Sequence, residues 1–350
     1  MNKLFLILLC TISIISSDEI IIKPVNISDI QYTPYKEEGY LQGWNFVFQN
    51  SEYTIFANFI VSNLGPFDLN HGVSIIIQTK NQKTIFLTKE FGRKDLEIAK
   101  DGFKIRSYNN ILEYDNGVYK VSQFFGDTKL YLEFNSDSKG ATLSAGKHFV
   151  KGNEKFVQAD IPFSFVQAKG YLDLKGEIIE LNGLGGMEHL LTNYEVYKFS
   201  SKWEILRAVN KKGFRFYSGG FHGINKIEND FFRTIAIQNN KGETLLSGRV
   251  RKSEILKSSK DPFSKHIIPE IEKLYLTDSC SVTIEMKDSL GKVNILSNIS
   301  AVLTFFVKLF FTNPFQINIE SHIKVDCPNE FKKGIEDFKG IHTLFLINPK

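Results

Sequence analysis

The chain has 350 residues, of which 42% are hydrophobic, and its formal net charge is +4. These values exclude a largely disordered chain and leave room for two domains of about 150–170 residues each. The lysines are spread along the chain, so the small positive charge gives no reason to expect a nucleic-acid partner. The 31 phenylalanines and 13 tyrosines favour strands, where they would fill cores or line an apolar cavity.

The first feature in chain order is a predicted secretory signal peptide at residues 1–17. Lys3 precedes a short apolar run, and Ser16 and Ser17 are small residues that suit cleavage. The apolar run is too short for a comfortable membrane span. We therefore expect an exported chain, periplasmic or secreted, without an integral membrane span once the peptide is removed.

The following residues predict strands more often than helices. Polar and apolar residues alternate in three runs, which are Lys129–Phe134, Ser281–Lys287 and Gln316–Asp326. Such alternation is typical of half-buried antiparallel strands. Turn-forming residues separate the strands at three places, which are Asp115–Gly117, Asn239–Gly242 and Asp288–Gly291. An all-β fold of sandwich or barrel type follows.

Three segments depart from this pattern. Asp95–Lys100 predicts at most a turn or two of helix. Pro262–Leu276 predicts a short helix, because several of its apolar residues lie near helical spacing. Asn298–Phe311 is the most apolar internal run, although Lys308 interrupts it and it is too short to cross a membrane. For this last run we expect a buried strand pair, or a strand that passes between two barrels.

The best position for a domain boundary is near Asp173–Glu180. A strand-like run there leads into a stretch rich in glycine, and no low-complexity linker is visible. The length then gives two β-domains of similar size, an N-terminal one at residues 18–178 and a C-terminal one at residues 179–350.

Cys280 and Cys327 are the two cysteines left after removal of the signal peptide. An oxidising compartment would allow a disulfide between them, and two unpaired thiols are the alternative. The chain has no C-x-x-C pair, no H-E-x-x-H motif and no complete glycine loop for phosphate or dinucleotide binding. We therefore expect neither a metal ion nor a cofactor.

The strongest candidates for chemistry follow the glycine-rich stretch Gly183–Gly186. We expect this stretch to form a turn that presents Met187, Glu188 and His189. A carboxylate or imidazole against apolar walls can donate or accept protons. Because neighbouring strand residues point to opposite faces, only one of Glu188 and His189 would face a cavity. The alternative is a hydrogen-bonded pair that braces the turn.

Candidate ligand contacts are spread over both halves of the chain. Trp44 and Trp203 are the two tryptophans, and each would either pack on a ligand or fill a core. Asn70 and His71 precede a strand and would either line the mouth of a pocket or lie in a solvated loop. Together with Met187, these residues form the predicted ligand-binding set.

Several short motifs occur in an order that resembles a known family. Gly43–Phe46, Tyr53–Pro66 and Asn70–Val73 resemble the first domain of carotenoid 1,2-hydratase (CrtC) and AttH-like proteins. Gly183–Glu204 and Thr312–Val325 resemble the survival factor 1 group. That group has a Gly-Met-x-x-His turn, whereas this chain places the histidine one residue closer to the methionine.

The resemblance implies an all-β fold of two consecutive lipocalin-like (calycin) antiparallel β-barrels packed together, with little helix. Members of the family include lipid carriers linked to oxidative-stress survival, carotenoid hydratases and pericyclase-type enzymes. The function we expect is an exported carrier for an apolar lipid or isoprenoid-like ligand. The alternative is a cofactor-free hydratase, isomerase or cyclase for an apolar polyene, with Glu188 or His189 as the proton donor.

Overall fold

The computed structural model describes residues 22–63, 70–79, 83–136, 140–298, 300–310, 314–328 and 337–347. The predicted signal peptide lies outside these residues. Within the described ranges, no helix is both long enough and apolar enough to cross a membrane. The chain folds into two curled antiparallel β-sheets, one a nearly closed barrel and the other a half-barrel. The all-β prediction with little helix is therefore confirmed.

The first sheet has 12 strands drawn from residues 40–193. The strands are β1 (Tyr40–Gln49), β2 (Tyr53–Ser62), β3 (Asn70–Thr79), β4 (Ile85–Gly92), β5 (Leu96–Ile98), β6 (Phe103–Ser107), β7 (Asn110–Asp115), β8 (Val118–Phe125), β9 (Thr128–Asn135), β10 (Ala141–Lys151), β11 (Lys155–Leu174) and β12 (Glu177–Asn193). Their order is β4-β3-β2-β1-β12-β11-β9-β8-β7-β6-β5, and β10 pairs with β11 beside this path.

The second sheet has 9 strands. They are β13 (Ser200–Val209), β14 (Arg215–Gly223), β15 (Phe232–Gln238), β16 (Thr244–Arg249), β17 (Lys252–Lys260), β18 (Ile267–Thr277), β19 (Cys280–Asn294), β20 (Phe315–Asp326) and β21 (Phe338–Leu346). Their order is β16-β15-β14-β13-β21-β20-β19-β18-β17. Cys280 and Cys327 form a disulfide at the ends of β19 and β20.

One short helix precedes β1, and others connect some of the strands. They are α1 (Ile27–Ile30), η1 (Arg93–Asp95), η2 (Val196–Lys198), η3 (Ile227–Asp230), η4 (Ile295–Asn298) and α2 (Ala301–Phe310). The chain passes from the first sheet to the second between Asn193 and Ser200, through η2. The boundary expected at residues 178 and 179 therefore falls inside the β11–β12 hairpin and does not coincide with the change of sheet.

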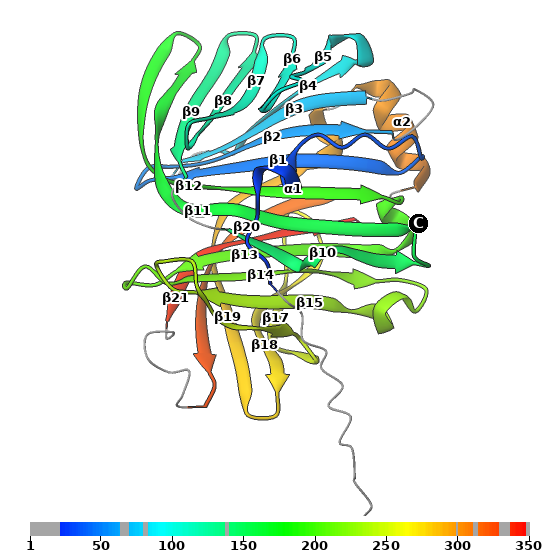
Figure 1. Cartoon of the computed structure of the whole chain (residues 1–350), viewed down its shortest axis with the longest axis vertical. Helices are drawn as coiled ribbons and strands as arrows, with labels where there is room; N and C mark the ends of the chain where they lie inside the picture. The colour runs from blue at the N-terminus through cyan, green and yellow to red at the C-terminus, as the bar shows by residue number, and fades with distance from the viewer. Residues whose placement is uncertain are drawn as a thin grey trace, which may run out of the picture.

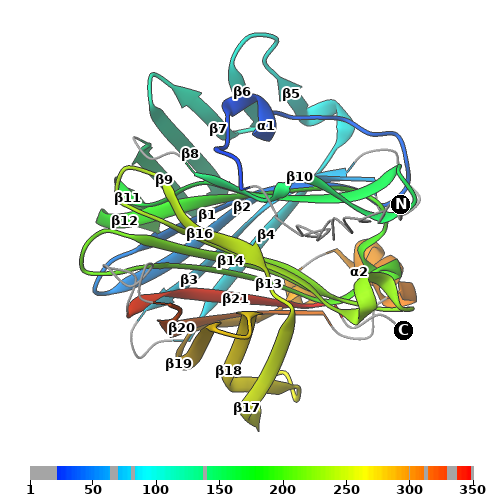
Figure 2. The ribbon, with the colours of Figure 1, turned by 60° about the horizontal axis from the view of Figure 1, so that its bottom comes forward.

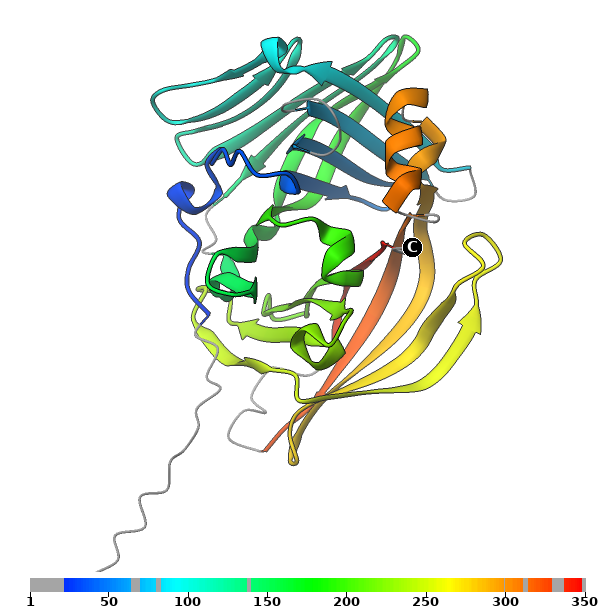
Figure 3. The ribbon, with the colours of Figure 1, turned by 90° about the vertical axis from the view of Figure 1, so that its right-hand side faces the viewer.

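The two sheets pack against each other through β1, β2, β3 and β10 on one side and β13, β14, β15, β19 and β21 on the other (Figure 1). Figure 2 shows the same two layers from a tilted view, and Figure 3 shows how each sheet curls away from the contact between them. Apolar residues of both sheets share clusters in this contact: one cluster includes Val47 and Ile341, and another includes Leu143 and Tyr217.

The N-terminal segment, residues 22–35, forms a strap across the first sheet. It begins beside β10, where the Thr142 amide donates to the Lys23 carbonyl at 2.9 Å. The indole Nε1 of Trp44 donates to the Ile30 carbonyl at 2.7 Å, which fixes the end of α1. The strap therefore covers one end of the inner face of the first sheet, where Trp44 is fully buried.

Two secondary-structure predictions are wrong. Pro262–Leu276 contains the strand β18 instead of a helix, and from Glu272 to Leu276 every second residue of this strand is buried. Asn298–Phe311 contains the helix α2 instead of strands, and Phe305 and Leu309 are exposed on it. An α-helix satisfies its backbone hydrogen bonds internally, so this apolar run needs no neighbouring strand.

Two predicted turns are parts of long strands. Gly183–Gly186 lies within β12, so the following Met187, Glu188 and His189 stand on a continuous strand. Asp288–Gly291 lies within β19, where the pairing with β20 shifts register twice and forms a bulge. The predicted turns at Asp115–Gly117 and Asn239–Gly242 are confirmed, and so are the three alternating strands.

Candidate functional site

Three voids lie in a row between the two sheets, with volumes of about 790, 70 and 10 Å³. Val47 and Arg207 line both the largest and the smallest void. Asn45 and Glu188 line both the smallest and the intermediate void. The voids therefore belong to one cleft, which Arg207 and Glu188 divide into a large cavity and a small apolar pocket.

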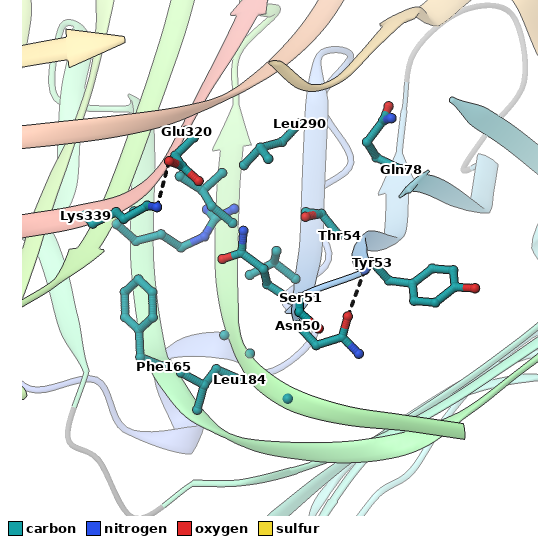
Figure 4. Close-up of a pocket in the computed structure, with 18 of the residues that line it drawn as sticks. Asn50, Ser51, Tyr53, Thr54, Gln78, Phe165, Leu184, Leu290, Glu320 and Lys339 are labelled. Carbon is teal, nitrogen blue, oxygen red and sulfur yellow. Dashed lines mark hydrogen bonds and ion pairs between the residues drawn. The ribbon is translucent and has the colours of Figure 1, made fainter. Parts of the chain in front are cut away.

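The large cavity of about 790 Å³ has a mixed polar and apolar wall (Figure 4). Phe165 and Leu184 contribute apolar surface from the first sheet. Glu320 and Lys339 form an ion pair of 2.9 Å on the second sheet. The wall is therefore suited to a ligand that carries polar groups along an apolar body.

Two irregularities of the chain shape this cavity. Gly183, Gly185 and Gly186 line it, and a Cβ atom at Gly185 would lie 2.3 Å from a ring atom of Phe134. Glycine thus allows β12 to approach its neighbours closely. Across the cavity, the bulge in β19 places Asp288, Ser289 and Leu290 in the wall. Bulges re-aim side chains in this way next to functional sites.

Glu188 and Arg207 form a buried ion pair that joins the two sheets. Glu188 comes from β12 and Arg207 from β13, and their side chains are 7% and 3% exposed. Burial lowers the pKa of Arg207 to about 9, so the guanidinium remains a cation at neutral pH. The guanidinium also lies 6.0 Å from the centre of the Phe56 ring, which contributes a cation–π contact.

The apolar pocket of about 70 Å³ lies beyond this ion pair. Its wall is mainly hydrophobic and includes Leu143, Trp203, Phe221, Phe232 and Phe345. The indole Nε1 of Trp203 is buried, and no described residue accepts a hydrogen bond from it. The pocket therefore has walls of aromatic and aliphatic side chains and one buried N–H donor, that of Trp203, without an acceptor among the described residues.

His189 is among the residues around the apolar pocket, but its ring points into the first sheet, as expected for a neighbour of Glu188. Its Nδ1 lies 2.8 Å from Asp160 Oδ2, and its Nε2 lies 2.8 Å from Gln42 Nε2. The Gln42 oxygen already accepts from the Thr33 amide, so the Gln42 amide donates to His189 Nε2. His189 then donates from Nδ1 to Asp160. The Trp44 ring lies 5.8 Å away, so Trp44 and His189 share the first sheet's interior.

The remaining predicted ligand contacts also lie in the first sheet. Met187 is fully buried in its core, and Asn70 is the half-buried first residue of β3. His71 is buried and stacks on Phe91 at 5.5 Å. Neither ring nitrogen of His71 has a hydrogen-bond partner among the described residues. Of the predicted set, therefore, Trp203 and Glu188 reach the cleft with their side chains, whereas Trp44, His71, Met187 and His189 face the first sheet's interior.

Sequence reasoning missed a second buried charged cluster, on the inner face of the second sheet. Arg233 Nη1 lies 2.9 Å from both Glu204 Oε2 and Glu272 Oε2, and His342 Nε2 lies 3.1 Å from Glu204 Oε2. Burial opposes ionisation of Glu204, but Lys202, Arg233 and two histidines hold its pKa well below the ordinary value. Within the described part of the chain, no group of three or more His, Cys, Asp or Glu residues is arranged to hold a metal ion.

Arg207 was also missed, although the sequence carries a signal for it. Arg207 interrupts the apolar run Ile205–Val209, and Arg233 interrupts the similar run Phe231–Ile237. A charged residue inside a strand that is otherwise apolar must find a partner in the folded chain. The sequence does not say which partner, because that depends on how the sheets pack.

Comparisons with solved structures agree with this architecture. An AttH-like protein of Nitrosomonas europaea superposes with a TM-score of 0.67 at 10% identity, over 93% of this chain and 98% of that one. Kievitone hydratase of Nectria haematococca superposes with a TM-score of 0.59 at 10% identity, over 95% of this chain and 94% of that one. CghA in complex with Sch210972 superposes with a TM-score of 0.58 at 8% identity, over 94% of this chain and 98% of that one. No family profile and no curated protein sequence matches the chain.

At these identities the comparisons establish the fold alone. The chain has the two-sheet, lipocalin-like architecture of these three proteins over nearly its whole length. Membership of the survival factor 1 or carotenoid hydratase families does not follow from them.

Proposed function

We propose that the cleft binds an elongated, largely apolar small molecule and that the chain converts it as a cofactor-free hydratase, isomerase or cyclase. The observation that carries this proposal is the buried Glu188–Arg207 pair between the large cavity and the apolar pocket. Apolar residues in place of a buried ion pair are often neutral or stabilising, so a pair kept in a cleft favours a functional role. The shared fold with kievitone hydratase and CghA points in the same direction.

The ion pair changes the role that the sequence suggested for Glu188. An adjacent cation favours the ionised carboxylate, so Glu188 acts first as a base and not as a proton donor. The N–H groups of Arg207 hold a carbonyl oxygen of the ligand and stabilise negative charge that develops there. The apolar part of the ligand occupies the pocket around Trp203, where each buried CH₂ contributes about 0.8 kcal/mol.

This arrangement accounts for each reaction of the proposed class. In hydration of a double bond conjugated to the carbonyl, Glu188 takes a proton from water while the water oxygen bonds to the distal carbon. The protonated Glu188 then returns its proton to the carbon next to the carbonyl. In isomerisation, Glu188 removes a proton from one carbon of the conjugated chain and returns it to another. In cyclisation, Arg207 polarises the carbonyl without net proton transfer.

The test is product formation from a metabolite extract of the native host. The chain from residue 18 onward is incubated with the extract in ordinary water and in water labelled with heavy oxygen, and the products are identified by mass spectrometry. Hydration incorporates the heavy oxygen, whereas isomerisation and cyclisation leave the oxygen content unchanged. We expect Glu188→Gln to slow product formation by about 10²–10⁴-fold, which is the usual contribution of a general base.

The double variant Glu188→Gln with Arg207→Met separates a functional pair from a structural one. A single change leaves one buried charge without its partner, which costs about 3–5 kcal/mol, whereas the double change removes both charges. We expect the double variant to unfold at nearly the wild-type urea concentration and to remain inactive. Activity in this folded variant would contradict the proposal. A host ligand recovered bound but unchanged would instead indicate a carrier.

We propose that the chain performs this role outside the cytoplasm, as its predicted signal peptide indicates. Sequencing the N-terminus of the protein from its host tests this directly. A start near Asp18 is expected, and an intact Met1 would contradict it.

A further inference from the structure

The β17–β18 hairpin exposes large apolar side chains to solvent, at positions that are usually polar. Phe263 in the turn is 49% exposed, and Ile267 directly after it is 72% exposed. Ile255 and Leu256 on β17 are 55% and 53% exposed. Figure 3 shows this hairpin, in yellow-green and yellow, projecting from the right-hand edge of the molecule. Scattered exposed residues are ordinary, but four on one projecting hairpin mark an interaction surface.

The same hairpin is basic on its surface. Residues 251–277 contain six basic and four acidic side chains. Two of the acids, Asp261 and Glu272, are buried and pair with Lys292 and Arg233. Lys260 and Lys265 flank the turn, and neither ammonium has an ion-pair partner among the described residues. The exposed surface of the hairpin therefore carries a clear positive excess.

The turn is built to hold Phe263 outward. The Asp261 amide donates to the His266 carbonyl at 2.8 Å, and the Ser264 amide donates to Asp261 Oδ2 at 2.7 Å. The Phe263 ring packs nearly perpendicular to the Phe315 ring, with the ring centroids 5.6 Å apart, and this contact supports it. The apolar tip is thus fixed in place before any partner arrives.

The position of β17 explains the lysines only in part. β17 is the last strand of its sheet, and lysines on such a strand prevent pairing with other chains. That role does not explain why Phe263 and Ile267 are exposed. Exposed apolar residues make a surface more prone to aggregation, which is the opposite effect. A surface that joins an apolar tip to flanking lysines is complementary to an anionic bilayer, where the tip enters the interface and the lysines meet headgroups.

We propose that the β17–β18 hairpin binds the surface of anionic lipid bilayers, with Phe263 and Ile267 inserted and Lys260 and Lys265 against the headgroups. This surface is separate from the cleft and does not depend on its chemistry. The hairpin would bring the chain to membranes that hold apolar molecules.

Vesicle flotation tests this proposal with the chain from residue 18 onward, since the predicted signal peptide would itself bind lipid. We expect binding to vesicles of phosphatidylcholine and phosphatidylglycerol in equal parts, and little binding to phosphatidylcholine alone. Lys260→Gln with Lys265→Gln should weaken binding by about thirty-fold, as expected for two lysines near an anionic surface. Phe263→Ser with Ile267→Ser should weaken it in low salt and in high salt alike.

The matched control lies on another hairpin tip. Lys175→Gln with Ile178→Ser removes a lysine and an isoleucine that is 69% exposed, but Glu177 and Glu180 surround them. Binding should be unchanged in this variant, and circular dichroism should show all variants folded. Equal loss in the control, equal binding to neutral vesicles, or binding to a soluble polyanion such as heparin without binding to vesicles would each overturn the proposal.

Discussion

The interiors of the two sheets are stabilised in different ways. The core of the first sheet mixes aliphatic side chains with many aromatic ones, including Trp44, Phe134 and Phe163, which contact one another or their neighbours in tilted ring pairs. The second sheet has an aliphatic core and the charged cluster around Arg233 and Glu204. Truncation in the first sheet leaves a void, whereas a change in the cluster leaves an unpaired buried charge. Charge compensation therefore involves more side chains in the second sheet, where four buried ionisable groups meet, than in the first, where His189 and Asp160 form a buried pair.

The largest expected effect is in the charged cluster. Arg233→Met should lower the free energy of unfolding by about 3–5 kcal/mol, because Glu204 and Glu272 lose their shared cation inside the protein. Urea unfolding followed by the fluorescence of Trp203, in a Trp44→Phe background, measures this loss. Adding Glu204→Gln and Glu272→Gln to Arg233→Met should recover part of the stability. A loss below about 1 kcal/mol, as for a surface pair, would remove the contrast between the sheets.

A smaller effect is expected for the disulfide of the second sheet. Cys280 and Cys327 are 47 residues apart, and closing a loop of that length contributes about 4 kcal/mol at most in the chain-entropy account, and typically about 2–4 kcal/mol. The variant Cys280→Ala with Cys327→Ala should lose this amount in the same urea experiment. The fluorescence of Trp44 in a Trp203→Phe background should report how far the first sheet shares the loss.

The smallest effect concerns pH. Burial lowers the pKa of His342, and it also lowers the pKa of His71 in the first sheet. Both imidazoles are therefore neutral in the folded chain, while in the unfolded chain they take up a proton below pH of about 6.5. Because only the unfolded chain binds these protons, the free energy of unfolding decreases as the pH falls below about 6.5. The decrease is up to about 1.4 kcal/mol per pH unit for each histidine.

Substitution assigns this acid sensitivity to each sheet. His71→Phe should reduce the loss of stability between pH of about 6.5 and 5, because it removes one imidazole that stays neutral when folded. Glu204 adds to the acid sensitivity of the second sheet, since its pKa is held low in the folded chain. An unchanged pH profile in His71→Phe would show that this histidine does not titrate on unfolding.

The all-β fold could be predicted because period-two alternation is clear in several strands, such as β9 and the second half of β20. The strand prediction failed for β18, because its buried position 272 is a glutamate whose partner, Arg233, is distant in sequence. The candidate Glu188 was visible from its motif, but its partner Arg207 was not. That pairing depends on how two sheets pack, and neither composition nor spacing within one strand carries this information.

The strap of residues 22–35 has a consequence for the order of assembly. It is the first described segment to be synthesised, yet Gln158, which donates to its Asp29 carbonyl at 3.2 Å, comes 129 residues later. Its contact with Thr142 on β10 is nearly as distant in sequence. The newly synthesised strap therefore cannot form these contacts until most of the first sheet has left the ribosome. The earliest residues of the fold are then among the last to settle.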